Sequence, residues 1–275
     1  MSGAGMETAN VDKAGTNSAN PGTAGGVAAS GGGATAGLLV DTRIEGGVCR
    51  IVLNRPDKMN ALSAAMVEQL HDALDRAHAE RCALIVLSGA GRNFSAGFDF
   101  GDVDAQSEGD LLLRFVRIEM LLQKLAGSPC LTAAFAHGKN FGAGVDLYAA
   151  CRLRYCTPEA SFRMPGLKFG LVLGSRRFAD LVGRETARRI LEQARAFAAD
   201  EALAMGFAQQ ALAQDQWPAA EAEAAAAAGQ LDGQARAGLY AALDAGDADR
   251  DLAALARSAA RPGLKRRILA YLGRS

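Results

Sequence analysis

The sequence predicts an α/β domain in which buried parallel strands alternate with helices. Two continuous apolar runs, residues 83–88 and 131–136, have the length of buried strands. Between them lies a segment with helical periodicity, about residues 111–126, which ends at the breaker sequence of residues 127–129. This alternation of strand and helix is typical of a parallel sheet crossed by helices.

The ordered domain is expected to begin near Leu38. Residues 48–53 predict a strand, and residues 54–57 predict a turn in which proline is well placed. An amphipathic helix follows, because apolar residues recur at helical spacing with charged residues between them. These apolar positions are Leu62, Met66, Leu70 and Leu74.

Beyond the strand at 131–136, His137 and Gly138 break the apolar run, and a small-residue turn at 141–144 leads into a helix at 145–151. Further helices are expected at 175–181, 184–194, 200–206 and 262–272, with Ser175 and Asp200 as the N-caps of the first and third. From Trp217 on, the chain is Ala-rich and helical, with breaks at Gly233 and Gly246.

Composition excludes several function classes. Of the 275 residues, 49% are hydrophobic and 22% are charged, as is usual for a globular domain. The 30 basic and 30 acidic residues give zero net charge, so nothing favours capture of nucleic acid or of an anionic membrane. No apolar stretch has the length of a membrane helix, and no secretory signal is visible. We therefore expect a cytoplasmic protein.

Residues 1–37 contain no Leu, Ile or aromatic residue and consist mostly of Gly, Ala, Ser, Thr and Asn. Such a segment buries too little apolar surface to offset its chain entropy, so we expect a disordered tail. The cysteines show no metal-ligand spacing, which predicts free thiols and no metal site. They are Cys49, Cys82, Cys130, Cys151 and Cys156.

Two of the expected strands end in turns rich in small residues, one after residue 88 and one after residue 136. Glycines let such a backbone approach a ligand, and N–H groups at a helix N-terminus favour an oxygen that becomes negatively charged. Two such turns can aim two N–H groups at one oxygen, which is the geometry of an oxyanion hole. Asp146 lies in the first turn of the helix that follows, where it either takes part in chemistry or stabilises the helix start.

Five segments together carry a family resemblance. They are IVLNRPDKMNAL (51–62), FSAGFDF (94–100), HGKNFGAGVDLYAAC (137–151), ASFRMPGLKFGLVLG (160–174) and ADEALAMGFA (199–208). Through their order and spacing the chain resembles the crotonase superfamily, the enoyl-CoA hydratase/isomerase family, over about residues 38–270.

The resemblance implies a crotonase-like ββα superhelix core at residues 38–210 and a helical C-terminal segment at residues 211–275. In the family this segment packs across a neighbouring subunit and helps to cover the acyl-CoA, so a homotrimer or a dimer of trimers is expected. The implied substrate is an acyl-CoA thioester. Coenzyme A would be part of that substrate, and no separate cofactor is implied.

The resemblance also assigns roles to residues. The backbone amides of Ala96 and Ala143 match the oxyanion donors that stabilise a thioester enolate, and Asp146 matches an acid/base. The other positions expected at the substrate are Lys58, Met59, Ala61, Ser95, Gly97, Phe98, Asp99, Phe100, Gly142, Pro165 and Gly166.

The acids depart from the pattern of the family. A hydratase of this type uses two carboxylates, whereas here the first position is Asp146 and the second is Gly166. Asp at the first position resembles the dienoyl-CoA isomerase branch, which has further carboxylates where this chain has Gly166 and Gly174. One carboxylate suffices to move a proton between the α- and γ-carbons, so the residues favour isomerisation over hydration.

Alternatives remain open for the neighbouring residues. His137 is either a structural hydrogen-bonding residue or a base. Arg163 either faces solvent, pairs with a carboxylate of the chain, or holds a substrate carboxylate, which would suit an acyl-CoA decarboxylase. The basic residues 265–267 are either solvated or contacts for the phosphates of coenzyme A. A thioester hydrolase, and a catalytically weak binding protein for CoA thioesters, are the remaining alternatives.

Overall fold

A computed structural model describes residues 38–243 and 246–274. The strands are β1 (Val40–Glu45), β2 (Val48–Leu53), β3 (Leu84–Gly89), β4 (Leu131–Ala136), β5 (Lys139–Phe141), β6 (Leu153–Cys156), β7 (Ser161–Arg163), β8 (Ala196–Ala198) and β9 (Gln210–Ala211). The helices are α1 (Ala64–Ala79), α2 (Glu108–Ala126), α3 (Ala143–Ala149), α4 (Ser175–Val182), α5 (Arg184–Gln193), α6 (Ala199–Ala204), α7 (Trp217–Ala228), α8 (Gly233–Leu243), α9 (Ala248–Ala259) and α10 (Leu264–Tyr271). Short 3-10 helices are η1 (Pro56–Lys58), η2 (Val103–Ala105), η3 (Gly166–Phe169) and η4 (Gln214–Gln216). The predicted tail, residues 1–37, lies outside the described residues.

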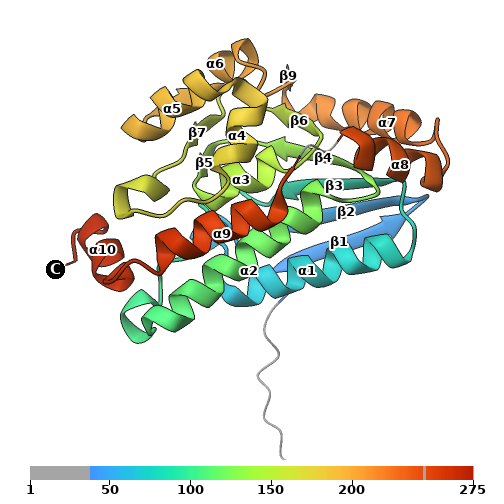
Figure 1. The fold of residues 1–275 in the computed structure, drawn as a ribbon. Helices are drawn as coiled ribbons and strands as arrows, with labels where there is room; N and C mark the ends of the chain where they lie inside the picture. Colours follow the sequence, from blue (N-terminus) through green and yellow to red (C-terminus); the bar gives the residue numbers. More distant parts are fainter. Residues whose placement is uncertain (1–37, 244–245, 275) are drawn as a thin grey trace, which may run out of the picture. The chain divides into compact units, whose positions relative to one another are not determined.

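The larger sheet has the strand order β1-β2-β3-β4-β6-β9, and all of its pairings except the β1–β2 hairpin are parallel. The predicted parallel sheet is therefore correct for its central strands. Strand β1 was not predicted, because its sequence mixes polar and apolar residues as an edge strand can. A smaller sheet, β5-β7-β8, lies beyond the carboxyl end of β4 and carries the site (Figure 1).

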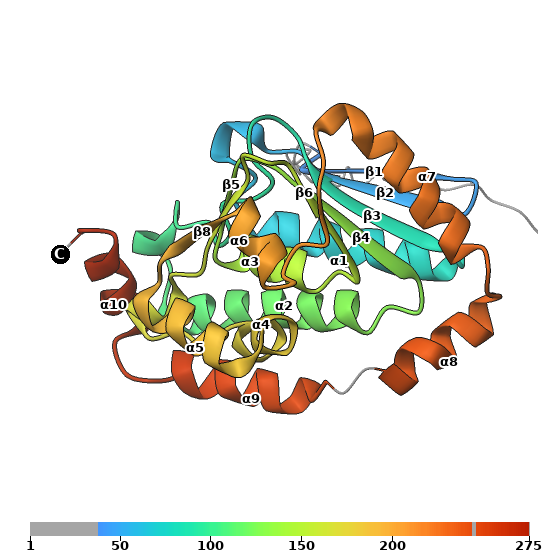
Figure 2. The same cartoon turned by 90° about the horizontal axis from the view of Figure 1, so that it is seen from above.

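Helices cover both faces of the larger sheet (Figures 1 and 2). Side chains such as Ile51 and Leu87 share one core with apolar residues of α1 and α2, among them Leu70 and Phe115. The opposite face packs against α7, whose alanines contact a second cluster around Phe135. This two-sided burial explains why the central strands are continuous apolar runs instead of alternating patterns.

Most of the expected helices are present, but two of the expected caps are wrong. Ser175 is the first residue of α4, and Gly174 is the N-cap with φ 62° and no side-chain hydrogen bond. Asp200 likewise lies within the first turn of α6, and Ala198 is the N-cap of that helix. In the helical region after residue 211, the structure has α7 to α10, and Gly233 and Gly246 lie at or between helix ends as expected.

Candidate active site

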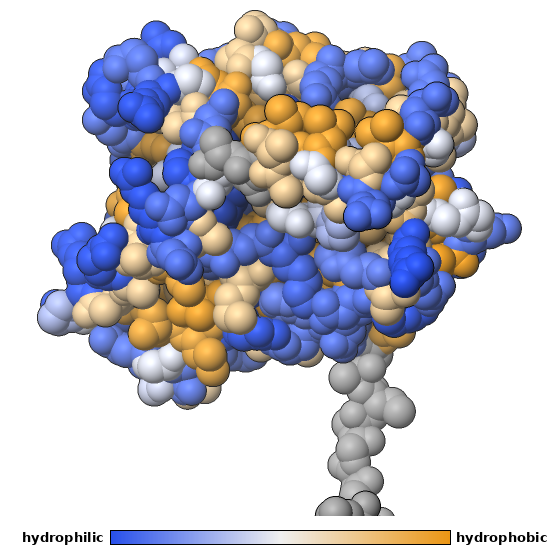
Figure 3. Space-filling model, turned by 45° about the vertical axis from the view of Figure 1, so that its right-hand side comes forward, coloured by the Kyte–Doolittle hydropathy of each residue, from blue (hydrophilic) through white to orange (hydrophobic). Residues whose placement is uncertain are grey.

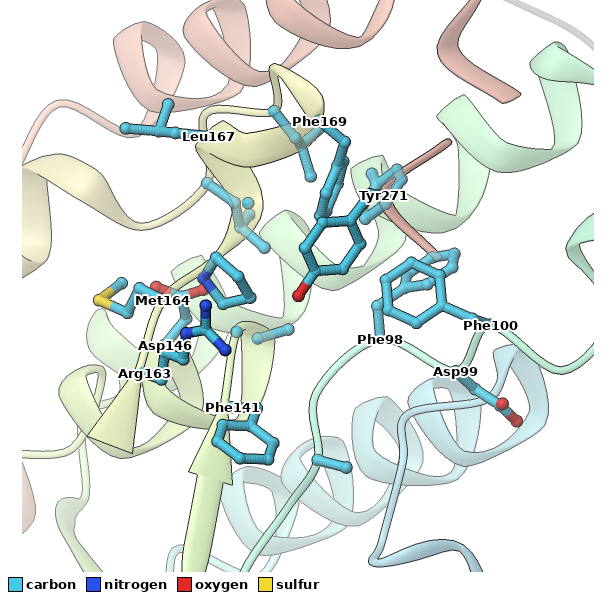
Figure 4. A pocket seen from close by; sticks show the side chains of 18 of the residues that line it. Phe98, Asp99, Phe100, Phe141, Asp146, Arg163, Met164, Leu167, Phe169 and Tyr271 are labelled. Carbon is cyan, nitrogen blue, oxygen red and sulfur yellow. The ribbon is translucent and has the colours of Figure 1, made fainter. Parts of the chain in front are cut away.

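A cavity of about 430 Å³ opens where the smaller sheet, η3 and α10 meet (Figure 4). Its walls are mostly apolar. They comprise Ala61, Ala96, Phe98, Asp99, Phe100, Gly101, Phe115, Phe141, Gly142, Ala143, Asp146, Arg163, Met164, Pro165, Gly166, Leu167, Phe169, Leu171, Leu173, Ser175, Leu191, Tyr271, Leu272 and Arg274. A mostly apolar pocket with a few polar groups is the usual form of a small-molecule site.

The two small-residue turns meet at this cavity through their backbones. The Phe141 N–H donates to the Ser95 carbonyl at 3.0 Å. Gly97 has φ +78°, and a Cβ on it would lie 2.3 Å from the Phe141 oxygen and 2.9 Å from the Ala143 nitrogen. Only glycine therefore permits this close approach, which brings the segments of the two predicted amide donors together.

The two predicted donors differ in their hydrogen bonding. Ala143 begins α3 at the cavity wall, and its N–H has no acceptor within the described residues. The Ala96 N–H instead donates to the Met59 carbonyl at 2.8 Å. A thioester oxygen would have to take this amide from Met59, so the role of Ala96 as an oxyanion donor stays a prediction.

The carbonyl of Met59 is held by a strained and firmly bonded segment. Met59 and Asn60 have φ values of 51° and 54°, which are unusual for residues other than glycine. The buried amide side chain of Asn60 donates to the carbonyls of Ala90 and Asn93, each at 2.9 Å. Its oxygen accepts the Arg55 N–H at 2.8 Å. These hydrogen bonds fix the position of the Met59–Asn60 peptide group, whose carbonyl accepts the Ala96 N–H.

Asp146 is the buried acid of the cavity. The residue is 3% exposed, and its Oδ1 atom has no hydrogen-bond partner among the described residues. Burial raises the pKa of this carboxyl well above its usual value, an effect that Arg177 opposes and Glu119 reinforces. Gly174 lies directly against it, since a Cβ there would be 1.8 Å from Oδ1.

A buried ion-pair cluster interacts electrostatically with Asp146. The Arg177 guanidinium donates to both carboxylate oxygens of Glu119, at 2.5 and 3.1 Å, and to Asp251 at 3.0 Å. Glu119 also accepts a hydrogen bond from Gln123 at 3.0 Å. Sequence reasoning missed this cluster, although Glu119 falls on the apolar stripe of its helix, where a charge needs a partner.

No second carboxylate replaces the missing acid within the described part of the chain. Asp99 is the other acidic residue in the wall, and it pairs with Arg55 at 2.5 Å and accepts the Gly101 N–H at 2.9 Å. Burial raises the pKa of Asp99, but the hydrogen bonds from Gly101 and Arg55 outweigh burial and lower it. Asp99 is therefore a carboxylate already committed to structure.

A family model described as enoyl-CoA hydratase/isomerase matches residues 43–264. The chain belongs to the enoyl-CoA hydratase/isomerase family. Its crotonase-like α/β fold, predicted from the sequence, is confirmed by solved structures of that fold.

Individual relatives agree with this family. A Mycobacterium leprae protein named a probable enoyl-CoA hydratase is 36% identical over 185 residues, covering 64% of this chain and 72% of that protein. The counterpart from Mycobacterium bovis is 36% identical over 165 residues, and the match spans only 65% of its length. The rat mitochondrial Delta(3,5)-Delta(2,4)-dienoyl-CoA isomerase is 32% identical over 176 residues, covering 58% of this chain and 54% of that protein.

Among solved structures, an enoyl-CoA hydratase/isomerase from Bordetella parapertussis is 60% identical with a TM-score of 0.85, covering 86% of this chain and 99% of that one. An enoyl-CoA hydratase from Bacillus halodurans has a TM-score of 0.75 at 22% identity, over 84% and 99% of the two chains, and shows the fold alone.

Within the described residues, no helix combines the length and apolar character needed to cross a bilayer. Among the same residues, no group of three or more His, Cys, Asp or Glu side chains is placed to hold a metal ion.

Four of the residues expected at the substrate lie outside the walls of the cavity of this hydratase/isomerase-family protein. Lys58 is exposed in η1, and Met59 contributes its carbonyl to Ala96. Ser95 is buried, and its hydroxyl donates to the Asn60 carbonyl at 2.9 Å. Gly97 supplies the close backbone approach described above. A role of Lys58 toward coenzyme A stays a prediction.

Contacts in the structure favour structural roles for His137 and for two of the basic residues at 265–267, whose roles the sequence left open. His137 lies outside the cavity walls, and its Nε2 is 2.9 Å from the Gly91 carbonyl, which favours a structural role. Lys265 donates to the carbonyls of Asp104 and Gln106 at 2.6 and 2.9 Å. Arg267 donates to the Phe169 carbonyl at 3.0 Å. These two cations fasten α10 to the rest of the chain.

The resemblance predicted that the C-terminal helical segment helps to cover the substrate, but sequence reasoning missed the wall from α5 and the individual residues of the C-terminal segment that line the cavity. Tyr271, Leu272 and Arg274 come from the end of the chain, and Leu191 comes from α5. The Tyr271 ring lies 5.2 Å from that of Phe169, so α10 covers the cavity of its own chain. Only the general helical pattern of this region was visible in the sequence, because contacts between distant segments have no local signal.

Proposed function

We propose that this protein processes acyl-CoA thioesters as an isomerase-type enzyme with a single carboxylate acid/base, Asp146. The thioester carbonyl would accept the Ala143 N–H and, after release of Met59, the Ala96 N–H. Asp146 would take a proton from the α-carbon, and the electron pair would be held as the enolate of the thioester. Return of that proton to the γ-carbon moves the double bond and consumes no other reactant.

One observation carries the proposal: a buried, unpaired carboxyl lies in the same mostly apolar wall as the free amide of Ala143. Its raised pKa brings it toward neutrality, where a general acid/base works best. The wall lacks a second free carboxylate within the described residues, so addition of water is less well served than proton transfer. Coenzyme A enters only as part of the substrate.

A second candidate is a catalytically weak binding protein for CoA thioesters. The hydrogen bond from the Ala96 N–H to Met59 favours it, since one of the two oxyanion donors is already occupied at 2.8 Å. A protein with one available donor would bind a thioester and stabilise its enolate poorly.

Deuterium washing into a saturated acyl-CoA distinguishes these functions. The wild-type protein should exchange the α-protons of bound butyryl-CoA for deuterium. Asp146→Asn should lower the exchange rate at least about 100-fold, because Asn cannot accept a proton. Binding of butyryl-CoA, measured by calorimetry, should change by less than about threefold. Binding without exchange in the wild type would identify the protein as a binder. Undiminished exchange in the variant would place the base elsewhere.

A further inference from the structure

Arg163 is a cation in the mostly apolar wall of the cavity. It is the last residue of β7 and pairs with Phe141 of β5 in the register of the smaller sheet, so both side chains lie on the same face. Figure 4 shows its guanidinium and the Tyr271 hydroxyl pointing into the same space. Both residues line the cavity, together with mostly apolar side chains.

One hydrogen bond from the Nε atom fixes the position of the Arg163 guanidinium. Its Nε donates to the Ala194 carbonyl at 2.8 Å. Ala194 ends α5 with φ 47°, an unusual conformation for alanine that presents its carbonyl to Arg163. The Gly142 N–H donates to the Arg163 carbonyl at 2.8 Å, which ties this residue to the turn that carries Ala143.

The other end of the guanidinium is available. Within the described residues, neither Nη atom has an acceptor, and Arg163 forms no ion pair with Asp146 or Asp99. Asp99 is satisfied by Arg55, and the raised pKa of Asp146 reduces the negative charge it can offer. The cavity therefore presents a fixed, uncompensated positive charge with two donors on a planar group.

A guanidinium with free Nη donors matches a carboxylate, which accepts two parallel hydrogen bonds from it. A saturated or unsaturated hydrocarbon chain would leave these donors desolvated and unsatisfied, at a cost to binding. We propose, on the basis of the proposed acyl-CoA function, that the substrates are acyl-CoA thioesters whose acyl chain carries a carboxylate, and that Arg163 binds this carboxylate.

The test compares two thioesters of similar chain length, glutaryl-CoA with a terminal carboxylate and hexanoyl-CoA with a terminal methyl group. Calorimetry at constant ionic strength should show that the wild-type protein binds glutaryl-CoA at least about 10-fold more tightly, as a hydrogen-bonded charge pair gives. Arg163→Met keeps the length and removes the charge, and it should abolish or reverse this preference while hexanoyl-CoA binding changes less than about threefold. Arg163→Lys keeps the charge without the planar fork and should retain only part of the preference.

The matched control is Arg274→Met, since Arg274 is the other arginine in the cavity wall and is exposed. It should affect both thioesters alike. Two outcomes would overturn the role of Arg163 alone. The first is equal binding of the two thioesters by the wild type. The second is a preference that is lost in Arg274→Met and retained in Arg163→Met. Absence of binding for every thioester would overturn the proposed function as well. If Arg163→Met fails to fold by circular dichroism, the wild-type preference and Arg163→Lys decide the question.

Discussion

At the scale of single residues, Asp146 and Gly174 constrain each other. Asp146 lies in α3 and Gly174 is the N-cap of α4, and nothing in the local sequence of either residue predicts the contact. Because a Cβ on Gly174 would lie 1.8 Å from Oδ1 of Asp146, the absence of a side chain at residue 174 sets where the carboxyl can be. Gly174 thus has a steric function beside Asp146.

Gly174→Ala should therefore displace Asp146 and reduce α-proton exchange by about 100-fold, the usual effect of a misplaced catalytic group. The alanine also has an unfavourable backbone conformation, which costs about 1–2 kcal/mol. Gly46→Ala is the control, because Gly46 has φ +58° and nothing within 4 Å of its Cβ. That variant should show a similar loss of stability in chemical denaturation with normal exchange. Equal exchange rates in the two variants would argue against the contact.

The pH dependence of stability should report the burial of Asp146. Its pKa in the folded protein is raised from the ordinary value of 3.8, so the folded state holds a proton that the unfolded chain releases. The contribution of Asp146 to wild-type stability therefore falls as the pH rises above about 4, by at most about 1.4 kcal/mol per pH unit. Asp146→Asn lacks this dependence.

In urea titrations, the free energy of unfolding of Asp146→Asn relative to wild type should accordingly increase between pH 4 and pH 7. Asp72→Asn, an exposed position on α1, should show no such trend. A difference that stays constant over this range would mean that Asp146 ionises normally in the folded protein.

At the scale of elements, the sequence predicted the longer ones, the helices from their periodic apolar positions and the buried strands from their continuous apolar runs. Strands β2, β3 and β4 and helices α2, α5 and α10 were expected close to their observed bounds, and the helix that became α1 was expected without bounds. The smaller sheet was missed, because strands of three residues are too short for an alternating pattern. The candidate acid and the Ala143 turn were recognised from motifs, whereas the walls from α5 and α10 depend on tertiary contacts.

The short helix η3 provides a test of the missing acid. The backbone of Gly166 is not in the left-handed region, and an added Cβ would meet only the Leu171 oxygen at 3.2 Å. Gly166→Glu can therefore be accommodated by a shift of a few tenths of an ångström and should raise hydration of crotonyl-CoA by at least about 10-fold.

Leu167→Glu is the matched control, since it places the same carboxylate on the next residue of η3, which also lines the cavity. It should leave hydration at the wild-type level, as followed by the loss of enoyl absorbance. A gain in both variants would point to a general effect of negative charge instead of a positioned acid.

At the scale of the whole molecule, the predicted assembly of several subunits is the main expectation that the structure of one chain leaves untested. Large hydrophobic side chains are exposed on α2 and α8, among them Leu113, Met120 and Leu239. Figure 3 shows hydrophobic patches between hydrophilic areas on one face. Exposed apolar groups of this kind often mark contacts between subunits.

We predict a homotrimer or a dimer of trimers. Light scattering at micromolar protein concentration should give about three or six times the mass of one chain, 28.5 kDa. A stable monomer would show that the single-chain cover provided by α10 is sufficient for the cavity.

Under the proposed function, the hydrogen bond between the Ala96 N–H and the Met59 carbonyl makes fold stability and substrate affinity compete. The amide of Ala96 can make one strong bond, either to the carbonyl of residue 59 or to a ligand oxygen, so the two are thermodynamically linked. Every interaction that holds residues 54–61 more firmly makes the ligand-competent arrangement rarer. A substitution that loosens this segment, far from Asp146, should thus lower the melting temperature and tighten substrate binding together. Selection for a more robust fold and selection for a tighter substrate complex act in opposite directions at this peptide group.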